Sequence, residues 1–267
     1  LESTTFLYGW DDHEIGNNRY WDDEVNAPVL PDKEGGSDPE TAMRITANGI
    51  QAWVEYTPAR VEYDPGASNL QDQLQLWRNF QFGDLVDLAI TDERLFRDGP
   101  PCEDGRRVTC TDEEADGRSM LGAEQKSDWK AWVRDSEAVW TAWANEVCTM
   151  PLTLGDGFNQ IEFIQDSWDG FQHERWELME FLEAHGPRNF VTLTGDLHGT
   201  LVGYQQEGYG EIEFDWDYDR VGVEFMTPSV TSANASDVLD LPGDGDDELV
   251  SEIVTDQNDH LQFANLQ

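Results

Sequence analysis

Apolar residues recur at helical spacing in two separate stretches of the chain. The first stretch, Glu40–Tyr56, is expected to be an amphipathic helix despite its internal glycine. Its apolar face carries Met43, Ala47, Ile50 and Val54. The second stretch, Glu174–His185, is predicted to be a helix that ends where Gly186 and Pro187 stop it.

The stretch Glu124–Trp143 has a similar but longer periodicity. Its apolar residues recur at spacings of three, four and seven: Trp129, Trp132, Val133, Trp140 and Trp143. The pattern predicts a helical region with a single apolar stripe. Asp135 and Ser136 are expected to divide it into two helices, with Ser136 as the N-cap of the second.

Short apolar runs between these stretches predict strands. They are Thr4–Tyr8, Leu85–Ile90, Ala144–Met150, Ile161–Gln165 and Phe190–Thr194. Glu211–Trp216 and Val221–Met226 are expected to pair as a hairpin, whereas Gly99–Arg118 is a polar insertion without periodicity. Strands that alternate with helices and then follow one another predict an α/β layered fold.

The charge of the chain narrows its possible functions. Its 267 residues include 56 Asp and Glu against 16 Lys and Arg, giving a formal net charge of −40. Such a surface repels phosphate backbones, which excludes a nucleic-acid-binding module. Its self-repulsion is screened only at high ionic strength, so the composition indicates a protein of a very salty medium, the alternative being an ordinary acidic protein.

No stretch approaches the ~20 apolar residues of a membrane-spanning helix. The N-terminal residues lack the features of a signal peptide, so an exported protein would need a leader upstream of Leu1. Cys102 and Cys110 bracket a polar loop and are either a disulfide or free thiols. Cys148 lies in an apolar run and is expected in the core.

Three polar clusters follow predicted strands: Trp10–Glu14, Asp166–Gly170 and Gly195–His198. Ligands of open α/β sheets bind beyond the carboxyl ends of the strands, so these clusters are expected to converge. Crowded carboxylates need cations to ionise together, and oxygen ligands favour Ca²⁺, Mg²⁺, Mn²⁺ or ferric iron. The clusters therefore indicate a metal site that activates water for phosphoryl chemistry, with solvated turns as the alternative.

The same clusters resemble motifs of one family. WDDHEIGNN resembles the WDDHE-x-x-NN motif of the PhoD-like alkaline phosphatase and phosphodiesterase family, DSWDGFQHER resembles its DSWDGYPAER, and LTGDLHGT resembles its TGDVHSS. The similarity continues in the family's order through LWRNFQFGDLVDLAITDERLFRD, LGAEQKSDW, EFMTPSVTSAN and NDHLQF. It covers most of residues 5–265.

The resemblance implies a calcineurin-like metallophosphoesterase fold, a layered α/β sandwich of mixed sheets flanked by helices. It also implies hydrolysis of phosphate monoesters or diesters by a metal-activated water, iron and calcium as cofactors, and export from the cell. The expected partner is a small phosphate ester, with no stable nucleic-acid binding.

The resemblance assigns metal ligands residue by residue. The superfamily motifs GNHE and GHxH match DDHE and GDLH here, so Asp12, Asp196 and His198 take metal-ligand positions. Asp166 or Asp169 supplies a further carboxylate, and the sequence does not decide between them.

His13 takes the position that contacts the phosphoryl group. Asn17 and Asn18 are candidates for substrate or metal contacts, and the alternative is that they cap the turn after the motif. Of the other polar residues, Arg175 is expected to pair with nearby carboxylates, and His260 to be structural rather than part of the site.

The family's earlier motifs lie upstream of WDDHE, and this chain begins after them. Residues 1–267 are therefore expected to be the C-terminal part of a single domain that lacks its first βαβ portion. That portion would supply a bridging aspartate and the cysteine and tyrosine ligands of iron. The alternatives are a truncated, catalytically inactive metal-binding remnant and an acidic calcium-binding or surface-interaction protein without chemistry.

Overall fold

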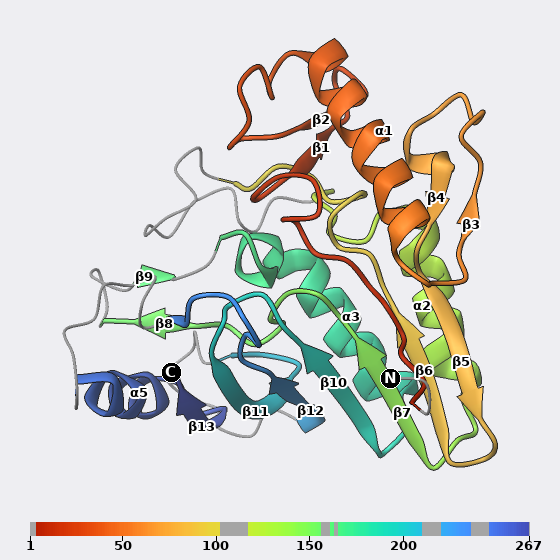
Figure 1. Ribbon diagram of the computed structural model, residues 1–267. Coiled ribbons are helices and arrows are strands. Elements are labelled where there is room, and N and C mark those ends of the chain that lie inside the picture. Colours follow the sequence, from red (N-terminus) through yellow and green to blue (C-terminus); the bar gives the residue numbers. More distant parts are fainter. Residues whose placement is uncertain are drawn as a thin grey trace.

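The computed structural model describes residues 4–101, 117–155, 161–162, 165–209, 220–235 and 246–266. Seven strands of these residues form one mixed sheet in the order β13-β11-β12-β10-β7-β6-β5 (Figure 1). The strands are β5 (Arg78–Phe82), β6 (Val86–Ile90), β7 (Trp140–Ala144), β10 (Phe190–Thr194), β11 (Thr200–Gln206), β12 (Arg220–Met226) and β13 (Leu261–Asn265).

The four central strands, β6, β7, β10 and β12, run parallel to one another, and the outer strands pair antiparallel. The carboxyl ends of the parallel strands therefore meet at one edge of the sheet. The other elements include the helices α1 (Pro39–Tyr56), α2 (Ala123–Asp135), α3 (Gln172–His185) and α5 (Asp246–Gln257), and the 3₁₀ turns η1 (Gln71–Gln73) and η3 (Trp168–Phe171). Short ladders are made by β1 (Tyr20–Asp22) with β2 (Ala27–Val29), β3 (Glu62–Tyr63) with β4 (Leu74–Gln75), and β8 (Thr153–Leu154) with β9 (Ile161–Glu162). The expected α/β class is confirmed.

Helices α2 and α3 cover one face of the sheet (Figure 1). Trp143 of β7 is fully buried there, with its ring 5.0 Å from that of Trp129 and 5.9 Å from that of Trp168. Each such aromatic side chain buries on the order of 200 Å². This aromatic core fixes the central strands against the helices, which holds their carboxyl ends in place.

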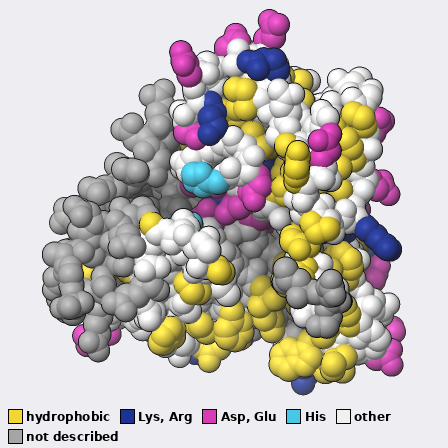
Figure 2. Space-filling view, viewed as in Figure 1, with side chains coloured by type: hydrophobic (Ala, Val, Ile, Leu, Met, Phe, Trp, Pro, Cys, Tyr) yellow, Lys and Arg dark blue, Asp and Glu magenta, His cyan; other side chains and the backbone are white. Residues whose placement is uncertain are grey.

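The opposite face of the sheet is apolar and exposed. Leu193 of β10 lies beside Phe225 of β12, and Val202 of β11 links Phe225 to Phe263 of β13. Leu193, Phe225 and Phe263 are 44%, 41% and 50% exposed. Figure 2 shows hydrophobic side chains gathered over the lower part of the sheet, with acidic side chains and a histidine in a hollow above them. An apolar sheet face of this kind marks an interaction surface.

The two-helix expectation for Glu124–Trp143 is wrong in its second half. Helix α2 ends at Asp135, and Ser136 is its C-cap, its N–H bonded to the carbonyl of Trp132. Trp140–Ala144 is instead the central strand β7, in which Thr141 and Trp143 point into the core. β-branched and aromatic residues favour a strand, and pairing with β6 and β10 overrides the helical spacing.

Further expectations are corrected at strand boundaries. Thr4–Tyr8 is not a strand, and Arg78 of β5 instead donates a hydrogen bond to the Tyr8 carbonyl at 2.5 Å. Ala144–Met150 is not a strand either, since β7 ends at Ala144. Of Ile161–Gln165, the first two residues form strand β9 and Gln165 lies in a turn, whereas residues 163 and 164 are outside the described residues.

The helix expected at Glu40–Tyr56 is confirmed as α1, with its buried face rotated by about one residue. The buried side chains are Ala42, Thr46, Ile50 and Trp53, whereas Met43, Ala47 and Val54 are half-buried beside them. Helix α3 and strands β6 and β10 are also confirmed.

Three expectations fall partly or wholly outside the described residues. Glu211–Trp216, the first strand of the expected hairpin, is outside them, and β12 pairs with β10 and with β11, a strand that the sequence did not predict. The polar insertion and its Cys102 and Cys110 are also outside, whereas Cys148 is buried as expected. Among the described residues, no helix is long and apolar enough to cross a membrane.

Candidate metal centre

The carboxyl ends of three parallel strands carry ionisable side chains. Asp92, Glu93 and Arg94 follow β6, Glu146 follows β7, and Asp196 follows β10. The segment of residues 10–19 brings further carboxylates to the same place. The strand-end rule therefore holds here, although of these strand-end residues only Asp196 was anticipated from the sequence.

Asp11, Asp12 and Asp196 form the core of the site. Each offers a carboxylate oxygen, and these oxygens all lie within 4.8 Å of one another. Asp12 is buried, and one of its oxygens accepts a hydrogen bond from the Asn18 N–H at 2.8 Å. Asp196 has a φ of 71°, in the left-handed region that costs a non-glycine residue about 1–3 kcal/mol.

Arg94 binds two of these carboxylates, those of Asp11 and Asp196, and also the carboxylate of Asp166. Its guanidinium is fully buried and donates to Asp11 at 2.6 Å, to Asp166 at 2.7 Å and to Asp196 at 2.6 Å. The three partners lie 83, 72 and 102 residues away along the chain. Arg94 therefore ties together three segments that meet only in the folded protein.

Asp166 is held by a second arginine as well. Arg97 donates to its other carboxylate oxygen at 2.6 Å and to its backbone carbonyl at 2.5 Å. Although burial opposes ionisation, the charges of Arg97 and Arg94 lower the pKa of Asp166 to about 2. Both carboxylate oxygens of Asp166 are thus engaged by arginines.

The pKa values of Asp11 and Asp196 are raised, whereas that of Asp166 is lowered. Burial raises the pKa of Asp196 to about 7, with a further contribution from the charge of Asp11. Burial also raises the pKa of Asp11, which the Arg94 charge opposes. Carboxylates that resist ionisation in this way favour a cation among them.

The two carboxylates that the sequence left open, Asp166 and Asp169, meet different arginines in the structure. Asp166 shares Arg94 with the site, whereas Asp169 pairs with Arg175 at 2.7 Å and accepts from the Leu152 N–H at 3.1 Å. Asp169 and Arg175 are both buried, so the pair connects η3, α3 and the chain before β8. The expected pairing of Arg175 with a nearby carboxylate is confirmed.

His198 lies two residues after Asp196, also with a left-handed φ, of 61°. Its Nδ1 is 2.7 Å from the carbonyl oxygen of Ala233, which can only accept, so Nδ1 donates. A metal-bound imidazole commonly donates its other nitrogen to a backbone carbonyl in the same way. The group of ligand oxygens within 4.8 Å does not include the His198 ring.

The remaining site candidates lie in the turn after Asp12. His13 is exposed, and the turn is closed by the Ile15 N–H, which donates to the Asp12 carbonyl at 2.9 Å. Asn17 and Asn18 are half-buried, and Asn18 has a φ of 54°. The Asn18 backbone N–H, not its side chain, donates to the Asp12 carboxylate.

His260, by contrast, is structural. It is buried, its Nε2 donates to the Pro151 carbonyl at 2.9 Å, and its ring packs edge-on to Tyr209. Burial lowers its pKa to about 4, so it is neutral over most of the pH range.

The donor set fits a hard cation. Asp11, Asp12, Asp166 and Asp196 supply four negative charges when ionised, and Arg94 and Arg97 return two positive ones. A net charge of about −2 remains on these six side chains, which favours a cation, and carboxylate oxygens are the ligands that hard cations prefer.

Sequence reasoning did not assign a role to Arg94, Glu93 or Glu146. Asp92, Glu93 and Arg94 directly follow the strongest strand in the sequence, so the strand-end rule alone could have placed them in the site. Nothing in the sequence shows that this arginine is buried, because most arginines lie on the surface.

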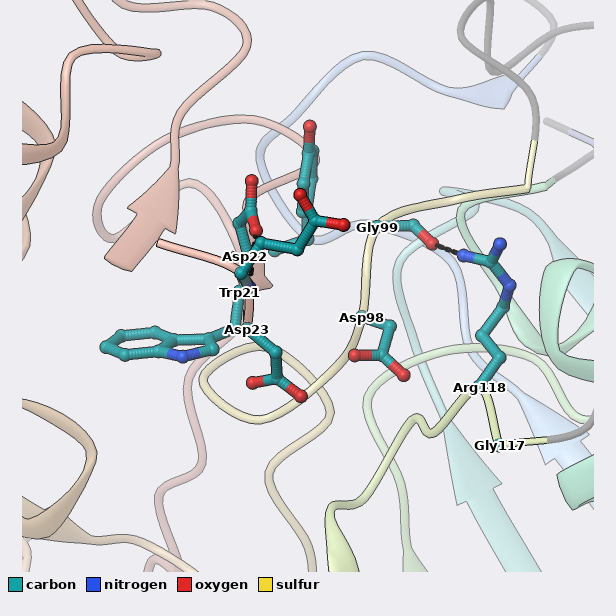
Figure 3. Close-up of a pocket in the computed structure, with 9 residues that line it drawn as sticks. Trp21, Asp22, Asp23, Asp98, Gly99, Gly117 and Arg118 are labelled. Atoms are coloured by element: carbon teal, nitrogen blue, oxygen red, sulfur yellow. Dashed lines mark hydrogen bonds between the residues drawn. The ribbon is translucent and has the colours of Figure 1, made fainter. Parts of the chain in front are cut away.

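A second hollow lies beside β1 and has a volume of about 400 Å³ (Figure 3). Asp22, Asp23 and Asp98 line it, and Arg118 donates to the Gly99 carbonyl at its rim. Burial raises the pKa of Asp98, to which the Asp23 charge adds. Its acidic lining disfavours a phosphate group, and none of its lining residues belongs to the carboxylate site.

Comparisons with known proteins agree with this fold. A model of the family described as PhoD-like phosphatase matches residues 2–267, so the chain belongs to the PhoD-like phosphatase family. It is 28% identical over 258 residues to alkaline phosphatase D from Bacillus subtilis (strain 168), covering 96% of this chain and 40% of that protein.

A solved structure titled "Structure of PhoD" matches with a TM-score of 0.77 and 26% identity, over 97% of this chain and 45% of that one. The expected metallophosphoesterase-type fold is therefore confirmed. The chain spans less than half the length of these relatives.

Proposed function

We propose that this chain contributes to a metal-dependent hydrolase of phosphate monoesters or diesters. The observation that carries the proposal is the group of Asp11, Asp12 and Asp196 at the carboxyl ends of the parallel strands. Membership of the PhoD-like phosphatase family and similarity to a protein named alkaline phosphatase D support it.

In this proposal Asp12 and Asp196 hold the cation, together with Asp11 and with His198 through Nε2. Ca²⁺ and Fe³⁺ are the proposed ions, as the resemblance implies, and oxygen-rich ligands suit both. A cation there would lower the pKa of a coordinated water and stabilise charge on the phosphoryl oxygens. Asp166, being engaged by two arginines, orients Arg94 and Arg97.

His13 is proposed to contact the phosphoryl group and to give a proton to the leaving oxygen. It is exposed and adjacent to Asp12, so a substrate on the surface can reach it. Asn17 and Asn18 are proposed as further contacts of the bound ester.

The chain is further proposed to be one part of a single domain whose other layer lies outside these 267 residues. The exposed apolar face of the sheet supports this, because a second layer packed on it would bury Leu193, Phe225 and Phe263. The relatives, more than twice as long, have residues to supply such a layer. The isolated chain is then expected to be weakly active or inactive.

Export and salt adaptation are proposed on separate grounds. The resemblance implies an extracellular or cell-surface protein. The net charge of −40 supports a medium in which surface charges are screened.

The proposal is tested with the protein expressed from its full coding sequence, by hydrolysis of p-nitrophenyl phosphate and bis-p-nitrophenyl phosphate in molar NaCl with Ca²⁺ and Fe³⁺. His13→Ala and Asp196→Asn are expected to lower the rate by about 10²-fold or more. Rates unchanged in both variants would reject these residues as the site. Cation binding without any hydrolysis by the protein expressed from its full coding sequence would favour the alternative of an inactive remnant.

A further inference from the structure

The Arg94 side chain places a positive charge among the carboxylates of this site, as a bound cation would. It is fully buried and bridges Asp11, Asp166 and Asp196 at 2.6–2.7 Å. These carboxylates come from three distant segments and would repel one another without a positive charge between them. The guanidinium supplies that charge within the folded chain.

We propose that Arg94 is a positioning residue that holds the carboxylates of the site together before a cation binds and, through its charge, lowers their affinity for that cation. This inference rests on the proposed metal-dependent function. It adds that part of the site's positive charge is built into the protein.

The hydrogen bonds show how Arg94 and a cation can share ligands. Arg94 engages Oδ1 of Asp11 and Oδ1 of Asp196, so these bonds leave Oδ2 of each to a cation. The Oδ1 atoms stay bound to the guanidinium, which fixes the rotation of both carboxylates.

The charge of the site sets the expected direction of change. With Arg94 and Arg97 present, the four carboxylates and the two arginines carry a net charge of about −2 when all are ionised. Replacing Arg94 by a neutral residue leaves about −3 and removes the repulsion between the guanidinium and the cation. Cation affinity therefore rises, while the protein without cation becomes less stable.

The test compares Arg94→Gln with Arg94→Lys in molar NaCl, using Mn²⁺ as the probe in calorimetric titration. Arg94→Gln is expected to bind Mn²⁺ at least about tenfold more tightly and to melt at a lower temperature in chelator. Arg94→Lys keeps the charge and is expected to bind within about threefold of the wild type.

Arg97→Gln is the matched control. Arg97 is also buried and pairs with Asp166, and its other hydrogen bonds go to backbone carbonyls, including that of Arg19 at 2.8 Å. Its hydrogen bonds do not include Asp11 or Asp196, so Mn²⁺ affinity is expected to change by less than about threefold. Equal tightening in both variants would show that position does not matter and would overturn the proposal.

Weaker or unchanged Mn²⁺ binding by Arg94→Gln would also overturn it. Should that variant not fold, the double variant Arg94→Gln/Asp166→Asn removes one charge of each sign. It is expected to bind Mn²⁺ at least as tightly as the wild type, and weaker binding overturns the proposal. If the wild type binds no Mn²⁺, this inference and the metal-dependent function both fail. This inference alone fails if three results occur together: the wild type binds Mn²⁺, Asp196→Asn abolishes that binding, and Arg94→Gln does not tighten it.

Discussion

Glu93 and Glu146 are hydrogen-bonded to each other twice. The backbone N–H of each donates to a carboxylate oxygen of the other, at 2.8 Å in both directions. The pair joins the ends of β6 and β7 beside Arg94. Burial raises the pKa of Glu93 from its ordinary value of 4.5 to about 7, and burial with the Glu93 charge raises that of Glu146.

This pair predicts a specific pH dependence of stability. Because the folded-state pKa of Glu93 is raised, its stabilising contribution is full below about pH 4.5 and is lost as pH rises through about 7. Glu93→Gln mimics the protonated group and is expected to stabilise the protein by about 1–3 kcal/mol at about pH 8, with little effect near pH 4.5. Urea unfolding at both pH values measures this.

Glu177→Gln serves as the control for that measurement. Lys126 and Lys130 bind Glu177 on the surface of α3 and lower its pKa, so its loss is expected to destabilise slightly at the higher pH. An equal effect of Glu93→Gln at both pH values would contradict a raised pKa.

The two tryptophans of β7 predict unequal losses on truncation. Trp143→Ala is expected to cost about 3–5 kcal/mol, because its ring is fully buried among aromatic neighbours. Trp140→Ala is expected to cost less than about 1 kcal/mol, since that ring is 46% exposed on the opposite face. Similar losses in denaturant unfolding would contradict the strand orientation.

Salt is predicted to control folding. The net charge of −40 is screened over ~3 Å at 1 M salt but over ~30 Å at 0.01 M. Dialysis to low ionic strength is therefore expected to reduce the helical circular dichroism signal, and returning the salt should restore it. An unchanged spectrum at low salt would count against salt adaptation.

The buried pair of Asp169 and Arg175 predicts a structural effect without loss of cation binding. Asp169→Asn removes the carboxylate charge that lies 2.7 Å from the Arg175 guanidinium and is expected to cost about 3–5 kcal/mol. Mn²⁺ binding by the folded variant should match the wild type. A stable variant that had lost Mn²⁺ would instead place Asp169 among the metal ligands.

The sequence predicted those elements whose local pattern agreed with their environment. Helices α1 and α3 and strands β6 and β10 form where their apolar residues predict them, although the buried face of α1 is rotated by about one residue. Trp140–Ala144 was missed because its tryptophans also continue the spacing of α2, and only pairing with β6 and β10 decides the outcome. Propensity yields to tertiary context there.

The residues of the site also differ in how far the sequence could predict them. Asp12 and Asp196 could be proposed because each lies in a short motif. The strand-end rule could have placed Arg94 at the site, but no local pattern reports its burial or its partners, which are 72–102 residues away. The sequence likewise does not show that Asp166 meets Arg94 whereas Asp169 meets Arg175 in the fold.

The most direct test is the rate of phosphate-ester hydrolysis by the protein expressed from its full coding sequence, in molar NaCl with Ca²⁺ and Fe³⁺. The wild type is expected to release p-nitrophenol from the monoester or the diester, and Asp196→Asn to be slower by about 10²-fold or more while remaining folded. Hydrolysis at the same rate in the wild type and in folded Asp196→Asn would contradict catalysis at the strand-end carboxylates.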